Sequence, residues 1–132
     1  MKLQTRMKSR SRRWGGGRAY DDAPIGLALI NSEGRFLQVS STFSYESAPG
    51  ATSCAGKIGR MFVNGVLVGP TDSFRVTMNN FLAAGGDGFT VFNEGTDALG
   101  GAQDIDALVD YFQANEPGGI AVPALNRIVP KP

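Results

Sequence analysis

The spacing of apolar residues changes along this 132-residue chain. In residues 35–45, and again in 73–79, apolar and polar side chains alternate with the period of two that a half-buried β-strand produces. Near the C-terminal end the period lengthens to that of a helix. The apolar positions of this segment, which form one stripe along a helix, are Ile105, Leu108, Val109 and Phe112. The pattern therefore predicts several strands followed by one amphipathic helix.

Turn residues divide the predicted strands. Asn64-Gly65 lies between "RMFV" and "VLV" and supplies the positive φ angles of a two-residue type I′ turn, so a hairpin is expected there. Asn31-Ser32-Glu33-Gly34 is a second turn-rich tetrapeptide between two apolar runs. The Gly- and Asp-rich residues after "FTVF" are predicted to form a loop, and "NRIV" near the C-terminal end a short edge strand.

The predicted helix carries its own boundary signals. Asp104 is the expected N-cap, and Asp106 lies in the first turn, where the helix dipole favours an acid. Pro117-Gly118-Gly119 ends the helix. Together these elements predict an α+β fold: a mixed, largely antiparallel sheet of short strands with one C-terminal amphipathic helix.

Charge divides the chain unevenly. Residues 1–20 hold seven of the thirteen bases and no acid, whereas the other 112 hold six bases and all twelve acids. We therefore expect a basic, disordered tail over residues 1–22 and a folded domain over 23–132. The tail suggests nucleic acid as an alternative partner, although a solvated extension is the favoured interpretation.

Several kinds of chemistry are excluded by composition. The chain has no histidine, which rules out catalysis by a Ser/His/Asp or Cys/His arrangement. Its single cysteine cannot form an internal disulfide bond. No run approaches 18 apolar residues, so no membrane span is expected, and no apolar stretch of the kind a secretory signal needs follows the basic residues.

The stretch "NNFLAAGGDGF", residues 79–89, is the strongest candidate for a site. Taken alone, Gly-Gly-Asp-Gly is typical of a tight turn, and it lacks the spacing of a dinucleotide fingerprint. The order of the segments around it is more specific. "GRFLQVSSTFSYE", "VNGVLVGPTDSFRVTMNNFLAAGGDGFTVF", "DIDALVDYF" and "NRI", covering about residues 34–129, resemble the C-terminal domain of the 5′-nucleotidase family of two-domain metallophosphoesterases.

The resemblance implies a role in nucleotide recognition for six residues. In the family the base lies between two aromatic rings, which correspond here to Phe36 and Phe81, while Asp87 corresponds to the acid that accepts hydrogen bonds from the ribose. Asn80 is a neighbouring polar contact, and Gly85 and Gly86 let the backbone approach a ligand closely. For Phe36, a place in the core of a strand is the alternative interpretation. The expected ligand is a nucleotide or nucleoside such as AMP.

The resemblance also implies what lies outside this sequence. The family's hydrolysis of nucleotides depends on a pair of divalent metals in an N-terminal metallophosphoesterase domain, so no catalytic residue, metal ligand or cofactor is expected in this chain. A truncated C-terminal domain with no activity of its own is the expectation, and a remnant without any ligand is the alternative. Family members are typically periplasmic, attached to the cell wall or secreted, but this chain does not indicate its own location.

Overall fold

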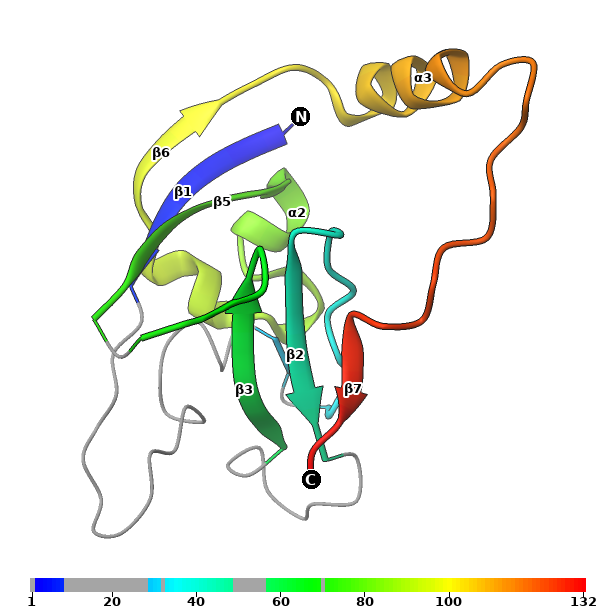
Figure 1. Cartoon of the computed structure of the whole chain (residues 1–132). Coiled ribbons are helices and arrows are strands. Elements are labelled where there is room, and N and C mark those ends of the chain that lie inside the picture. The colour runs from blue at the N-terminus through cyan, green and yellow to red at the C-terminus, as the bar shows by residue number, and fades with distance from the viewer. Residues whose placement is uncertain (1, 9–28, 32, 49–56, 70) are drawn as a thin grey trace, which may run out of the picture.

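A computed structural model describes residues 2–8, 29–31, 33–48, 57–69 and 71–132 of the chain (Figure 1). Its elements are β1 Lys2–Lys8, β2 Phe43–Ser47, β3 Ile58–Val63, β4 Val66–Leu67, β5 Ser73–Asn79, α2 Asn80–Ala83, the 3₁₀ turns η2 Gly86–Gly88 and η3 Thr90–Glu94, β6 Thr96–Gly100, α3 Asp104–Ala114 and β7 Ile128–Pro130. Cys54, most of the basic segment and the start of the apolar run after Pro24 lie outside the described residues.

The strands form two sheets. One has the order β5-β1-β6 with both pairs antiparallel, and the other has the order β4-β3-β2-β7, in which only β2 and β7 are parallel. The mixed, largely antiparallel α+β architecture predicted from the sequence is therefore confirmed. Within the described residues, neither α2 nor α3 is long and apolar enough to cross a bilayer.

Three local predictions are confirmed at the level of the backbone. Asn64 and Gly65, with φ angles of 49° and 77°, connect β3 to β4 as the type I′ signal requires. The alternating residues 73–79 form β5. The last predicted strand is present as β7, which lies at the edge of its sheet beside β2.

The predicted strand over residues 35–45 is wrong for most of its length. Phe36 makes only an isolated bridge with Ile30, and the regular strand begins at Phe43. A turn separates the two parts, because the amide of Phe43 donates to the carbonyl of Ser40 at 3.1 Å. The Oγ of Ser40 also lies 2.9 Å from the Oγ1 of Thr42. Hydroxyl side chains favour such turns over a ladder, which explains why the alternation alone misled.

The predicted tail and loop are also partly wrong, since both contribute strands. Lys2–Lys8 pair with β5 in unbroken antiparallel register, and Thr96–Gly100, predicted as loop, pair with the other side of β1. The bases obscure a period of two in "KLQTRMK", and the partner strands supply the backbone donors and acceptors that make this segment a strand. Residues 9–22 of the predicted tail lie outside the described residues.

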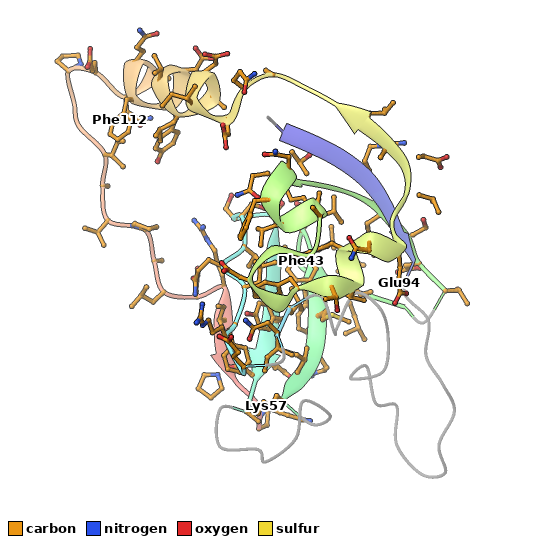
Figure 2. All side chains as sticks on the ribbon, turned by 180° about the vertical axis from the view of Figure 1, so that it is seen from behind. Phe43, Lys57, Glu94 and Phe112 are labelled. Atoms are coloured by element: carbon orange, nitrogen blue, oxygen red, sulfur yellow. The ribbon has the colours of Figure 1, made fainter. Side chains whose placement is uncertain are left out.

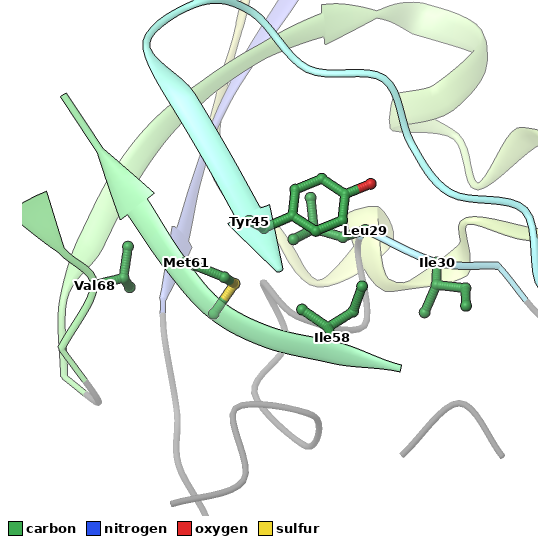
Figure 3. Packing of buried hydrophobic residues seen from close by; sticks show 6 residues of the cluster. All are labelled: Leu29, Ile30, Tyr45, Ile58, Met61 and Val68. Carbon is green, nitrogen blue, oxygen red and sulfur yellow. The ribbon is translucent and has the colours of Figure 1, made fainter. Parts of the chain in front are cut away.

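The main core lies against β2 and β3 (Figure 3). Its buried members are Leu29, Ile30, Tyr45, Ile58, Met61 and Val68. The hydroxyl of Tyr45 donates to the carbonyl of Leu37 at 2.9 Å, so the buried phenol keeps a partner. Burial raises the pKa of Tyr45 above its usual value, and the group therefore remains a donor at neutral pH.

A second, smaller core lies under the segment that follows β5. Met78, Phe89, Val91 and Phe92 are buried together, and Leu82 and Ala83 pack against them. The rings of Phe89 and Phe92 are 6.3 Å apart between centroids. This cluster holds α2, η2 and η3 against the end of β5, and so it fixes the segment that contains most of the candidate site.

An ion pair between the buried Glu46 of β2 and the exposed Arg60 of β3 joins the two strands. The Glu46 carboxylate accepts from Nε of Arg60 at 2.8 Å and from the Arg60 amide at 3.0 Å. The side-chain hydrogen bond from Arg60 lowers the pKa of Glu46, although burial acts in the opposite direction. The carboxylate is therefore ionised and paired at neutral pH.

The helix α3 is present where the sequence predicts it, but it begins differently. Gln103 is the N-cap, and Asp104 is the first helical residue, whose Oδ1 accepts from the amide of Ile105 at 3.1 Å. Asp106 lies in the first turn as predicted. The apolar stripe is exposed, and in Figures 1 and 2 the helix, with Phe112, lies apart from the packed side chains around Phe43.

This difference in burial predicts unequal effects of two alanine substitutions. Leu108 on α3 is 49% exposed and Met61 in the main core is 0% exposed. Met61→Ala should lower the free energy of unfolding by about 2–5 kcal/mol, and Leu108→Ala by less than about 0.5 kcal/mol. Urea unfolding followed by circular dichroism measures both. A loss at Leu108 as large as that at Met61 would show that α3 is packed in solution.

Candidate functional site

The candidate site begins with the short helix α2, which follows β5 directly. Asn79 is its N-cap, and the Oδ1 of this residue accepts from the amide of Leu82 at 2.8 Å. Gly85, with φ 80° in the left-handed region, ends the helix, and its amide donates to the carbonyl of Leu82 at 2.9 Å. The sequence interpretation missed this helix, although an Asn cap followed by a Gly stop was a usable signal.

Phe81 points outward from α2. Its side chain is 56% exposed, whereas the neighbouring Leu82 and Ala83 pack against the smaller core. The ring lies against Gly86, because a Cβ built on that glycine would be 2.5 Å from Cε1 of Phe81. Any side chain at position 86 would displace the ring. The glycine thus allows an aromatic surface to rest on the turn that follows.

Asp87 stands at the exposed tip of that turn. Its φ of 52° is in the left-handed region, where a residue other than glycine is uncommon. The amide of Phe89 donates to the carbonyl of Gly86 at 3.2 Å and closes the turn, while the ring of Phe89 is buried beneath it. The carboxylate is therefore carried by a turn that is anchored from below.

Five of the six predicted residues lie within one short segment of the chain, residues 80–87. Asn80 is the exposed first residue of α2, Phe81 follows it, and Gly85, Gly86 and Asp87 form the turn. Gly85 also packs closely on η3, since a Cβ there would lie 2.9 Å from Nδ2 of Asn93. These contacts make the segment a compact shelf of one aromatic ring and one carboxylate.

Phe36 is placed differently from the other five residues. Its half-buried ring packs against the main core, stacked on Tyr45 with 6.5 Å between centroids and 28° between planes. Part of its aromatic surface is therefore already in contact with protein. Its backbone forms a bridge with Ile30, the neighbour of Asn31, and the Asn31 side chain in turn binds the turn that carries Asp87.

Asn31 connects the two parts of the candidate site. Its Nδ2 donates to the carbonyl of Asp87 at 2.6 Å, across 56 positions of sequence. The sequence interpretation placed Asn31 in a turn but missed this contact. The turn itself was visible in the residues 31–34, whereas no local signal indicates a partner so distant along the chain.

A cavity of about 520 Å³ lies between β5 and residues 37–43 and extends to Leu82 of α2 and Phe92 of η3. Its lining is mainly apolar and includes Phe43, Val63, Phe74 and Val76. None of the six predicted site residues lines it. Phe81 and Asp87 are exposed, so the candidate site is on the surface of the domain and not in this cavity. Across the part of the chain that the structure describes, no three Cys, Asp or Glu side chains gather in a way that could hold a metal ion.

Comparison with known proteins identifies the family of the segment that contains this shelf. The model of the family described as "5'-nucleotidase, C-terminal domain" matches residues 28–94, which include all six predicted site residues. The trifunctional nucleotide phosphoesterase protein YfkN of Bacillus subtilis (strain 168) is 38% identical over 73 residues, which are 52% of this chain and 5% of that protein. The chain thus spans about one twentieth of the length of this relative. Because the family match takes in half of the chain, the chain belongs to the 5′-nucleotidase C-terminal domain family, whose domains are associated with nucleotide hydrolases.

Proposed function

We propose that this chain is a nucleotide-recognition domain of a 5′-nucleotidase-type hydrolase acting in nucleotide catabolism. In this proposal the base stacks between Phe81 and Phe36, and the Asp87 carboxylate accepts hydrogen bonds from the ribose hydroxyls. The observation that supports it is that the exposed ring of Phe81, on α2, lies against the turn that carries the exposed carboxylate of Asp87.

The chemistry of the shelf suits a nucleoside. Stacking of a base on an aromatic ring contributes roughly 1–3 kcal/mol and tolerates every base, because each has a flat π face. A carboxylate only accepts hydrogen bonds, and its two oxygens match the two hydroxyls of a ribose. Asn80 is exposed beside Phe81 and offers both a donor and an acceptor. Gly85 and Gly86 leave room for the Asn93 side chain and the Phe81 ring, which pack against them and hold the ring in place beside Asp87.

Hydrolysis would be supplied by a companion N-terminal phosphoesterase domain. A pair of divalent metals in that domain would activate water for attack on the phosphate. The role of this chain would be to bind and orient the nucleoside so that the phosphate reaches that centre. No residue of this chain is assigned to the chemical step.

Phe81→Ala tests the stacking surface. Isothermal titration with adenosine should show binding by the wild-type chain and an affinity about tenfold lower for this variant, since the main aromatic face is lost. Phe112→Ala is the matched control, because it removes an exposed phenylalanine from α3. Equal affinities of wild type and Phe81→Ala would reject the proposed site. Absence of adenosine binding by the wild type would favour a domain without a ligand of its own.

Phe36→Leu tests the second ring separately from the core. Leucine preserves an apolar side chain, so the free energy of unfolding should fall by less than about 1.5 kcal/mol. If Phe36 also stacks on the base, adenosine affinity should fall severalfold, because leucine offers no aromatic face. Unchanged affinity in a folded Phe36→Leu variant would assign Phe36 to the core alone and leave Phe81 as the single ring.

A further inference from the structure

The side chain of Asn31 uses both ends of its carboxamide. Oδ1 accepts from the amides of Glu33 and Arg35 at 3.0 and 2.8 Å, which is an Asx turn extended by one further bond. Nδ2 donates to the carbonyl of Asp87 at 2.6 Å. The residue is only 1% exposed, so water does not compete for these groups. Its local bonds hold the carboxamide in one orientation while the long-range bond reaches the shelf.

The backbone around Asn31 reinforces that orientation. The amide of Asn31 donates to the carbonyl of Arg35 at 3.1 Å, and the amide of Gly34 donates to the carbonyl of Asn31 at 3.0 Å. The turn is thus closed by main-chain and side-chain bonds together. Since the orientation is fixed locally, the donor Nδ2 has a defined place before Asp87 meets it.

The backbone conformation of Asp87 has to be stabilised by its surroundings. Its left-handed φ of 52° is unfavourable for a residue with a side chain and persists only where the surroundings enforce it. The group that Asn31 binds is the carbonyl of Asp87 itself, so a rotation of this residue out of the left-handed region would break a partly buried hydrogen bond. The bond from Asn31 therefore restrains the backbone from which the exposed carboxylate projects.

We propose that Asn31 is a positioning residue for ribose recognition, which aims the Asp87 carboxylate at the two hydroxyls without touching the ligand. This inference rests on the proposed function of the shelf. It differs from a purely structural role in one measurable respect. A positioning residue affects the contribution of the ribose hydroxyls to binding, whereas general loosening of the domain weakens all nucleosides alike.

Asn31→Asp is the most informative variant. The new carboxylate retains both acceptor contacts with Glu33 and Arg35, but it loses the donor and places an oxygen against the Asp87 carbonyl. Asn64→Asp is the matched control, because it adds the same charge at an exposed turn residue with a positive φ. Asn31→Ser is the second variant if Asn31→Asp fails to fold, since serine supports a similar turn but is too short to reach Asp87.

The readout is the ratio of dissociation constants for 2′,3′-dideoxyadenosine and adenosine. This ratio should fall about tenfold in Asn31→Asp and remain unchanged in Asn64→Asp, because one charge-assisted contact is lost. In an Asp87→Asn background, Asn31→Asp should cause no further fall. An equal loss of affinity for both nucleosides, or the same fall on the Asp87→Asn background, would overturn the inference.

A measurement without ligand separates this inference from the proposed function. Failure of the wild type to bind either nucleoside would reject the function. In that case amide hydrogen exchange still tests whether Asn31 holds the turn. Exchange at residues 86–89 should be faster in Asn31→Asp than in Asn64→Asp, with no difference across β3. Equal rates at residues 86–89 would overturn the positioning role.

Discussion

The hydrogen bond from Asn31 to the carbonyl of Asp87 joins two parts of the chain that lie 56 positions apart in the sequence. On one side is a turn stacked against the main core through Phe36 and Tyr45, and on the other is a helix and turn resting on Phe89 and Phe92. Each side has its own apolar support, so each is locally rigid. A partly buried bond to a main-chain carbonyl then links the two sides at Asp87.

The groups exposed on the shelf are suited to binding a ligand and not to carrying out a chemical step on it. The shelf exposes an aromatic ring and a carboxylate, and these groups can bind a flat base and a diol. None of the six candidate residues lines the apolar cavity between β5 and residues 37–43, although Leu82, the neighbour of Phe81, does. In the proposed function this domain selects and orients a nucleoside, and a companion domain would supply the chemical step. This division agrees with membership of a domain family associated with nucleotide hydrolases.

Local signals in the sequence predicted local structure well. Asn64-Gly65 specifies its turn through positive φ angles, and the stripe from Ile105 to Phe112 specifies a helix whether or not it is covered. Strands that form only by pairing with segments distant in the sequence could not be predicted from local signals. β1 forms between β5 and β6, and β6 forms by pairing with β1. The hydroxyls near Ser40 interrupt the segment in which alternation predicted one continuous strand. The resemblance supplied Phe81 and Asp87, but Asn31 required the folded chain, because its partner lies 56 residues away.

The most direct test of this account is a titration of the ¹⁵N-labelled chain with adenosine, followed by amide chemical shifts. Binding at the shelf predicts that the largest changes fall on residues 80–88 and on the Asn31 side-chain amide, because a stacked base shifts nearby resonances strongly. Amides of β3 should change little. The account would be contradicted if the largest changes fell on residues 37–43 and 74–78, which line the apolar cavity, or if saturating adenosine left residues 80–88 unchanged.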